Sequence, residues 1–228
     1  MLRASRLVGT LLITLTVMAV TATDGRASGL DLRLGAFFPR ADSNLFRDDS
    51  ELYTVGKDDW RGFNGGAEFA WGLGDRWELG VHLDGYGRTV NTEYRDFERE
   101  SGRPITQSLK LTSVPLGFTV RFVPGGRHAL TPYVGGGADV VFYEYEEFGD
   151  FVDFEDPDLP VIGDDFISRG AFPGAHVVAG LRVPVSHDFS LTAEGRYLWA
   201  RGNMADDFRG NRLDLTGPSA TIGVHLTF

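Results

Sequence analysis

The last eleven residues of the chain, PSATIGVHLTF, alternate between apolar and polar side chains and end on an aromatic residue. Ala220, Ile222, Val224, Leu226 and Phe228 fall on one face, and the side chains between them are small or polar. Successive side chains of a β-strand point to opposite faces of its sheet. The pattern therefore predicts a strand with one face in an apolar environment and the other in a polar one.

The same alternation recurs in segments bounded by clusters of glycine, proline, aspartate or asparagine. Between residues 77 and 90, for example, Trp77, Leu79 and Val81 share one face, whereas Glu78 and His82 share the other. The pattern predicts eight strands. Their approximate ranges are 30–38, 62–73, 77–90, 106–123, 131–144, 171–185, 189–200 and 213–228.

The connections between these segments alternate in length. Residues 74–76, 124–129 and 186–188 make short turns, whereas 39–61, 91–105, 145–170 and 201–212 make long loops. An even number of strands with short turns at one rim and long loops at the other is typical of outer-membrane barrels. We therefore predict an all-β fold for residues 28–228: an eight-stranded antiparallel up-and-down transmembrane β-barrel with short periplasmic turns and long extracellular loops.

Alternation alone does not say which face points outward, because a soluble lipocalin-like barrel alternates in the same way with its apolar face inside. Two features favour the membrane barrel. Aromatic residues such as Trp71, Trp77 and Trp199 lie near strand ends on the apolar faces, as interfacial girdles do. Glycines such as Gly66 and Gly80 interrupt the charged faces, as a crowded narrow lumen requires.

Two segments break the regular spacing of apolar residues. Leu109 and Leu111 are out of step with the apolar positions that follow Pro115, and Leu213 and Leu215 are out of step with those that follow Pro218. A β-bulge adds one residue to a strand and tolerates proline, so we predict bulges beside these two prolines.

The N-terminus has the features of a signal peptide over residues 1–27. Two arginines precede a charge-free apolar run from Leu7 to Val20, and small residues allow cleavage after Ala22 or Ala27. Fourteen apolar residues are fewer than the roughly 20 that a transmembrane helix needs. The chain has no cysteine, which excludes disulfides, thiolate metal sites and a lipidated N-terminal cysteine. We expect export to the periplasm and then the bacterial outer membrane.

The chain is acidic, with 32 Asp and Glu residues against 22 Lys and Arg and a net charge of −10, which argues against nucleic-acid binding. Residues 144–170 hold ten acidic residues and one base, Arg169. Clustered carboxylates bind Ca²⁺ or the divalent ions that bridge lipopolysaccharide, although a solvated acidic loop remains the alternative. The candidate cation ligands are Asp153, Glu155, Asp156, Asp158, Asp164 and Asp165.

Strand parity places a balanced set of charged residues inside the barrel. Because an isolated charge is costly in a narrow bore and a paired one is tolerable, we predict an ion-pair network that closes the lumen. The alternative is a gated pore in which Glu68 or Glu194 with Arg196 rearranges. The predicted network comprises Asp31, Arg33, Glu68, Glu78, Asp84, Arg88, Arg121, Asp139, Arg182, Glu194 and Arg196.

Three histidines, His82, His176 and His225, also face the predicted lumen. No short spacing in the sequence forces them together, so we expect hydrogen-bonded polar side chains there rather than a metal site. No cofactor is expected.

The segments TPYVGGGAD (131–139), SVPLGFTVRF (113–122), LTAEGRYLWA (191–200) and the terminal GVHLTF resemble small eight-stranded outer-membrane barrels grouped with the OmpA transmembrane domain, OmpX and OmpW. The resemblance implies a monomer in contact with outer-membrane lipid and lipopolysaccharide. It also implies insertion by the barrel-assembly machinery, which reads the terminal aromatic, here Phe228. Because nothing follows Phe228, we expect no periplasmic peptidoglycan-binding domain.

Some outer-membrane barrels are enzymes, but the required motifs are missing. His225 is not followed by the serine of the lipid A deacylase pattern, and the chain has neither HExxH nor a phosphate-binding loop. We therefore expect a non-enzymatic protein with a structural or surface role. One alternative is an OmpW-like passive channel for small hydrophobic molecules, for which Val141 and Val178 are the obvious inward apolar candidates. Another is an adhesin that binds a partner through residues 39–61 and 144–170.

Overall fold

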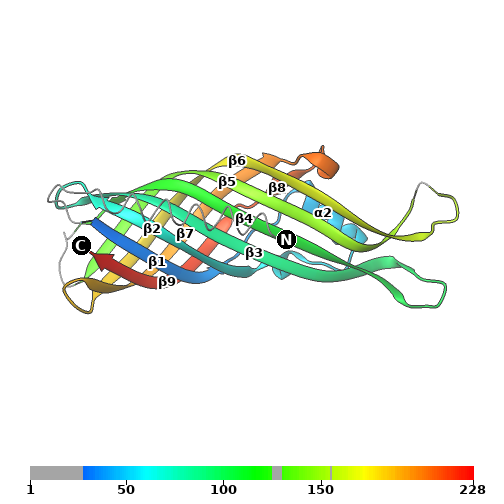
Figure 1. Cartoon of the computed structure of the whole chain (residues 1–228), viewed down its shortest axis with the longest axis horizontal. Coiled ribbons are helices and arrows are strands. Elements are labelled where there is room, and N and C mark those ends of the chain that lie inside the picture. The colour runs from blue at the N-terminus through cyan, green and yellow to red at the C-terminus, as the bar shows by residue number, and fades with distance from the viewer. Residues whose placement is uncertain (1–27, 125–129, 155) are drawn as a thin grey trace.

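The computed structural model describes residues 28–124, 130–154 and 156–228, and these residues form a closed antiparallel β-barrel (Figure 1). Each strand pairs with its neighbours, and β6–β7 and β1–β9 pairings close the ring. The prediction of an eight-stranded up-and-down barrel is confirmed, since β8 and β9 together fill the eighth position. The strands are β1 (Ser28–Phe37), β2 (Gly62–Gly72), β3 (Trp77–Glu98), β4 (Pro104–Phe122), β5 (Thr131–Val152), β6 (Val161–Pro184), β7 (Phe189–Asn203), β8 (Arg212–Asp214) and β9 (Gly217–Thr227).

Several strands are much longer than a membrane crossing requires. β3 and β5 have 22 residues each and β6 has 24, whereas about 9 to 11 residues suffice for a tilted transmembrane strand. The β3–β4 and β5–β6 hairpins therefore project beyond the rest of the barrel at the end away from the C-terminus (Figure 1). We call this end the hairpin rim and the opposite end, with the three short turns, the turn rim.

Because these strands are so long, two of the predicted long loops are much shorter than expected. Most of residues 91–105 and 145–170 belongs to strands, and only 99–103 and 153–160 connect them. Backbone pairing continues along these segments: Glu144 of β5 pairs with Arg169, and Val152 pairs with Val161. Most of their charged side chains, such as Glu93 and Glu146, are compatible with strands because they point outward from a part of the barrel where the outer surface is polar.

The two faces of a strand exchange polarity along its length. Near the turn rim of β4, Phe118 and Val120 point outward while Thr119 and Arg121 are buried in the lumen. Toward the hairpin rim of the same strand, Leu109 is fully buried inside and Lys110 points out. The barrel thus has an apolar exterior in one part and an apolar interior in the other.

This exchange overturns the two predicted bulges. β4 and β5 pair without a shift from Gln107 opposite Gly149 to Phe122 opposite Val134, and Pro115 lies inside this ladder. β7 likewise keeps one register with β8 and β9. The leucines before Pro115 and Pro218 stay on the inward face of the barrel wall, and at this level of the barrel the interior is apolar.

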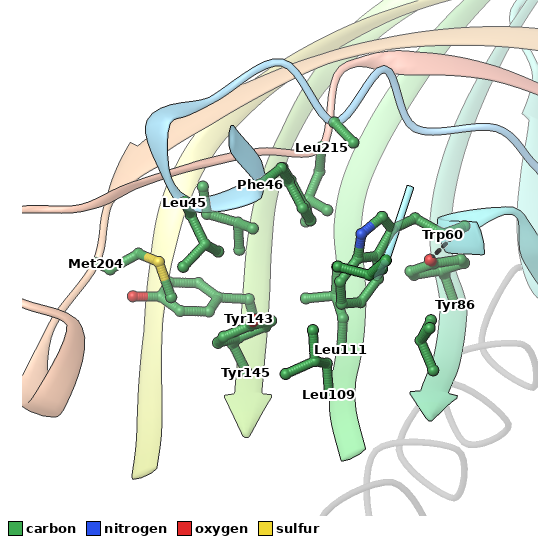
Figure 2. Packing of buried hydrophobic residues seen from close by; sticks show 14 of the residues in the cluster. Leu45, Phe46, Trp60, Tyr86, Leu109, Leu111, Tyr143, Tyr145, Met204 and Leu215 are labelled. Atoms are coloured by element: carbon green, nitrogen blue, oxygen red, sulfur yellow. Dashed lines mark hydrogen bonds between the residues drawn. The ribbon is translucent and has the colours of Figure 1, made fainter. Parts of the chain in front are cut away.

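The interior near the hairpin rim is filled by the chain itself (Figure 2). The connection after β1 contributes α2 (Asn44–Leu52) and the 3-10 helix η2 (Lys57–Trp60), with Leu45, Phe46 and Trp60 buried. We define the apolar plug as these three residues with Met204, Leu213 and Leu215 from the last connection and β8. A second 3-10 helix, η3 (Asp206–Phe208), lies in that connection.

The plug packs on inward residues of the long strands, among them Leu109, Leu111 and Tyr145, in one buried cluster. A nine-residue helix such as α2 is marginal in isolation, so this packing supplies most of its stability. None of the helices in the described part of the chain is long and apolar enough to cross a membrane.

We expect Leu109→Ala to lower the free energy of unfolding by about 2 to 5 kcal/mol, because it opens a cavity beneath the plug. Thr106→Ala is the matched control, since Thr106 is an exposed residue of the same strand. Chemical denaturation of the refolded protein measures both variants. Equal, small effects would contradict an apolar core at this level of the barrel.

Candidate functional site in the barrel lumen

Six charged side chains cross the middle of the lumen and form what we call the charged layer. Arg33 lies at its centre, with Nη1 donating to Glu68 Oε2 at 3.0 Å and Nη2 donating to Asp84 Oδ1 at 2.9 Å. Arg196 Nη1 donates to Asp84 Oδ2 at 2.9 Å. The layer comprises Arg33, Glu68, Asp84, Arg121, Glu194 and Arg196, contributed by β1, β2, β3, β4 and β7.

Arg121 extends the charged layer toward the turn rim. Its Nη2 donates to Glu68 Oε2 at 2.7 Å and lies 3.4 Å from Glu194 Oε2. Tyr133 donates its hydroxyl to Glu194 at 2.9 Å, and the Arg121 guanidinium lies 5.1 Å from the centre of the Tyr133 ring. Three cations and three anions thus compensate one another where neither sign alone is tolerable.

Two glycines make room for these side chains. A Cβ at Gly66 would lie 1.9 Å from Asp84 Oδ1, and one at Gly80 would lie 1.8 Å from Glu68 Oε1. The strand walls therefore have to be bare backbone where the carboxylates of neighbouring strands lie against them.

A second charged group lies next to the turn rim. Arg182 Nη1 donates to Glu78 Oε1 at 3.1 Å, and its Nη2 lies 3.6 Å from Asp31 Oδ2. His225 Nδ1 lies 3.1 Å from Asp31 Oδ1. Glu78, Arg182 and His225 line a cavity of about 270 Å³ that opens at the turn rim, so this end of the lumen is a shallow vestibule.

Asp139 is the one predicted network acid whose ion pairs are with histidines alone. His82 Nε2 lies 2.8 Å from its Oδ1, and His176 Nδ1 lies 2.7 Å from its Oδ2. Thr119 Oγ1 lies 3.3 Å from His82 Nδ1 and 3.0 Å from His176 Nε2. We call these four residues the histidine ring. Nothing in strand spacing alone indicated it, because β4 and β5 separate β3 from β6 in the sheet.

Arg88 lies outside the predicted lumen network. It is exposed and donates its Nε to the backbone carbonyl of Asp59 at 2.6 Å. The reason is its place in β3: the pairing with β2 ends at Gly87, so no β2 residue flanks Arg88. The parity of β3 continues, since Val90 and Tyr94 are buried, but the missing neighbour leaves Arg88 open to solvent.

The described residues of the predicted cation loop are not gathered into one group of ligands. Asp164 and Asp165 lie in β6 with exposed side chains, and Asp156 accepts a hydrogen bond from the backbone N–H of Asp158. Asp153 is half-buried, and Glu155 lies outside the described residues. Within the described ranges, the one group of histidine and carboxylate side chains with metal-ligand spacing is His82, Asp139 and His176.

A buried acid pair fastens the plug above the charged layer. Tyr145 donates its hydroxyl to Asp49 Oδ2 at 2.8 Å and also lies 2.9 Å from Glu147 Oε1. Both acids lie outside the lipid-facing part of the barrel. The outer surface at this level is charged, because Glu144 and Glu146 point outward from the same part of β5. Burial, with the Glu147 charge second, raises the pKa of Asp49 to about 8, and burial raises the pKa of Glu147 to about 7.

The outer face nearer the turn rim is an apolar belt with aromatic edges. Leu34, Phe118 and Ile222 are exposed on it, Trp77 and Phe228 lie at the turn rim, and Trp199 lies on the side of the hairpin rim. Phe228 pairs its backbone with Ser28 and contacts Phe69, with ring centres 5.8 Å apart. An apolar belt around a polar lumen defines an integral membrane β-barrel.

Comparison with known proteins agrees. The chain matches the outer membrane protein beta-barrel domain family over residues 10–228. No curated protein matches it in sequence. Among solved structures, OprG of Pseudomonas aeruginosa is 12% identical with a TM-score of 0.55, covering 89% of this chain and 96% of OprG. Neisserial surface protein A is 15% identical with a TM-score of 0.49, covering 90% and 98%.

The closed ring, the apolar belt and the match to the family model define a bacterial outer-membrane barrel. The chain belongs to the outer membrane protein beta-barrel family, and its location is the bacterial outer membrane. The turn rim, which carries Phe228 and the short turns, is the periplasmic end, and the hairpin rim is the extracellular end. Residues 1–27, the predicted signal peptide, lie outside the described residues.

We expect Arg33→Met to destabilise the folded barrel by about 3 to 5 kcal/mol, because it leaves the Glu68 and Asp84 charges without their central partner. Arg88→Met is the control, since Arg88 is exposed, and we expect a change within about 0.5 kcal/mol. Urea unfolding in lipid vesicles measures both. A loss as small for Arg33 as for Arg88 would contradict a cooperative charged layer.

The plug is expected to loosen as pH rises. The ordinary carboxyl pKa is about 4, so between about pH 4 and 8 the folded state holds protons that the unfolded chain has released, and stability falls across this window. Asp49→Asn should flatten the dependence, whereas exposed Asp48→Asn should not. Fluorescence of Trp60, in a variant without the other tryptophans, reports plug unfolding in urea at each pH.

Proposed function

We propose that this chain is a non-enzymatic, non-conducting outer-membrane barrel with a structural and surface role. The observation that carries the proposal is the filling of the lumen at two separate levels. The charged layer crosses the bore within the membrane, and the apolar plug occupies it toward the extracellular end. The charged layer is held by ion pairs and the plug by apolar packing, so conditions that weaken one leave the other in place.

The space between the two levels is small. A cavity of about 30 Å³ lies there, lined by Arg33, Asp84 and Asp139 below and by Phe37 and Leu198 above. Such a volume accommodates about one or two water molecules. This supports a closed bore, because an ion crossing it would have to displace both the guanidinium groups and the plug.

The passive-channel alternative needs an apolar patch in the extracellular half of the lumen. Val141 is one inward apolar residue there, and Leu109 and Leu111 add to the same surface. However, Leu45 and Trp60 of the plug already cover it. A small hydrophobic molecule would have to compete with the protein's own side chains, which favours closure over transport.

The surface role rests on the two projecting hairpins. The β5–β6 hairpin carries outward acidic residues together with the exposed side chains of Phe148, Phe154 and Ile162. Acidic and apolar groups on a rigid two-stranded support suit contact with neighbouring lipopolysaccharide, through shared cations, or with an external partner. In the same proposal the protein is monomeric and Phe228 is presented to the barrel-assembly machinery.

A non-enzymatic role agrees with the surroundings of the histidine ring. His82 and Asp139 form a base and acid pair of a kind that enzymes use, but their hydroxyl neighbour, Thr119, is fully buried between the histidines. A substrate would reach it only through the charged layer or the plug. The ring is therefore better suited to an internal role than to turnover of lipid.

Single-channel recording in planar bilayers tests the proposal. We expect no steady conductance from the wild-type protein, nor from a variant in which residues 43–60 are replaced by a short Gly-Ser linker, because the charged layer still closes the bore. The same replacement of residues 43–60 combined with Glu194→Ala and Arg196→Ala should produce discrete openings.

Heat-modifiable migration on a gel controls for folding of every variant. Reproducible openings of the folded wild type would refute the proposal and favour the gated pore. Openings after replacement of residues 43–60 alone would show that the charged layer does not seal the bore by itself.

A further inference from the structure

We propose that His82, Asp139 and His176 form a lumen site for one divalent transition-metal ion of the Zn²⁺ class. The three residues come from β3, β5 and β6 and are 0%, 5% and 2% exposed. Their three candidate ligand atoms all lie within 4.8 Å of one another. The barrel wall thus brings together residues that are distant in the sequence.

The donor set suits this class of ion. Zn²⁺ binds imidazole nitrogen and carboxylate oxygen at about 2.0 to 2.2 Å and, with three protein ligands, keeps a fourth position for water. Tetrahedral bonds of that length place ligand atoms about 3.3 Å apart. The two rings therefore have to approach slightly from their present spacing. The cavity of about 30 Å³ beside Asp139 provides room for the water ligand.

Thr119 is placed to orient both imidazoles. A metal-bound histidine usually donates its other ring N–H to an oxygen, which fixes the ring. His82 Nδ1 and His176 Nε2, the nitrogens on the far sides of the rings from Asp139, lie 3.3 and 3.0 Å from the Thr119 hydroxyl oxygen. That oxygen has two lone pairs, so it accepts from both histidines at once.

Proton counting supports a cation in the ring. The closed ring has four contacts, from Asp139 to His82, Thr119, His176 and back. An ionised carboxylate supplies no proton, each neutral imidazole supplies one and the hydroxyl supplies one, so one contact lacks its proton. A metal between the histidines and Asp139 replaces the two contacts to Asp139. Each histidine then has one N–H left, which it donates to Thr119.

The charge of the lumen points in the same direction. Six acids (Asp31, Glu68, Glu78, Asp84, Asp139 and Glu194) face four arginines (Arg33, Arg121, Arg182 and Arg196) in the membrane-spanning part. No arginine or lysine of the described chain forms an ion pair with Asp139. With neutral histidines, one dication at Asp139 brings the formal net charge of these lumen side chains to zero.

Metal binding to the full-length refolded protein tests the proposal. The protein is refolded with Zn²⁺ present, because the site is buried in the closed bore beside the charged layer, and is then passed through a desalting column. We expect about one Zn²⁺ per chain by elemental analysis and, after Co²⁺ loading, the visible absorption of a four-coordinate ion.

The variants locate the site. His82→Gln and His176→Gln should each lose the stoichiometric ion, Thr119→Val should weaken binding about 10- to 100-fold, and His225→Gln should bind like the wild type. His225 is the matched control because it is a buried lumen histidine that pairs with Asp31. Heat-modifiable migration confirms folding, and Thr119→Val still tests the site if a histidine variant does not fold.

Three results would overturn the proposal. The first is a folded wild type that retains no Zn²⁺ and shows no four-coordinate Co²⁺ absorption, which would mean that an extra proton completes the ring. The second is retention of the ion by His82→Gln and His176→Gln. The third is loss of the ion by His225→Gln alone, which would place the metal at the vestibule.

Discussion

The structure depends on the cost of placing ionised groups in a narrow bore surrounded by lipid. An arginine such as Arg33 is tolerable there only with carboxylates in contact, and Glu68 and Asp84 reach it from two other strands. That requirement fixes which residues must be opposite one another across the barrel. It also explains Gly66 and Gly80, whose missing side chains leave the carboxylates their space. Register, glycine positions and closure of the lumen follow from one electrostatic condition.

The barrel passes through two kinds of surroundings, and long strands such as β4 have a segment in each. Where the outside is lipid, apolar side chains such as Phe118 point out, and where the outside is water, apolar side chains such as Leu109 point in. The sequence shows this as a change of parity, which has the same appearance as a one-residue insertion. Unbroken pairing across Pro115 distinguishes the two explanations, and only the backbone partners provide that information.

Sequence patterns predicted the fold and the inward orientation of most lumen charges, because both follow from a period of two within one strand. They did not predict which inward residues meet, since that depends on the stagger between strands: His82 and His176 are neighbours across two intervening strands, whereas His225 pairs with Asp31. Arg88 was misplaced because β2 has ended beside it and leaves its side chain exposed, although the parity of β3 continues. The plug was missed because a polar loop with a few apolar residues does not show where it folds.

The plug joins the two ends of the sequence. Asn44 of α2 accepts a hydrogen bond from the backbone N–H of Arg212 at 2.9 Å and donates to Asn211 at 3.2 Å. Leu45 from the first connection shares one buried cluster with Leu213 and Leu215, just before the final strand. The cluster is complete only when the residues just before β9 meet those of the first connection, so the packing of α2 depends on both ends of the chain. A barrel in which β9 does not pair with β1 would therefore leave the apolar side chains of α2 without part of their cover.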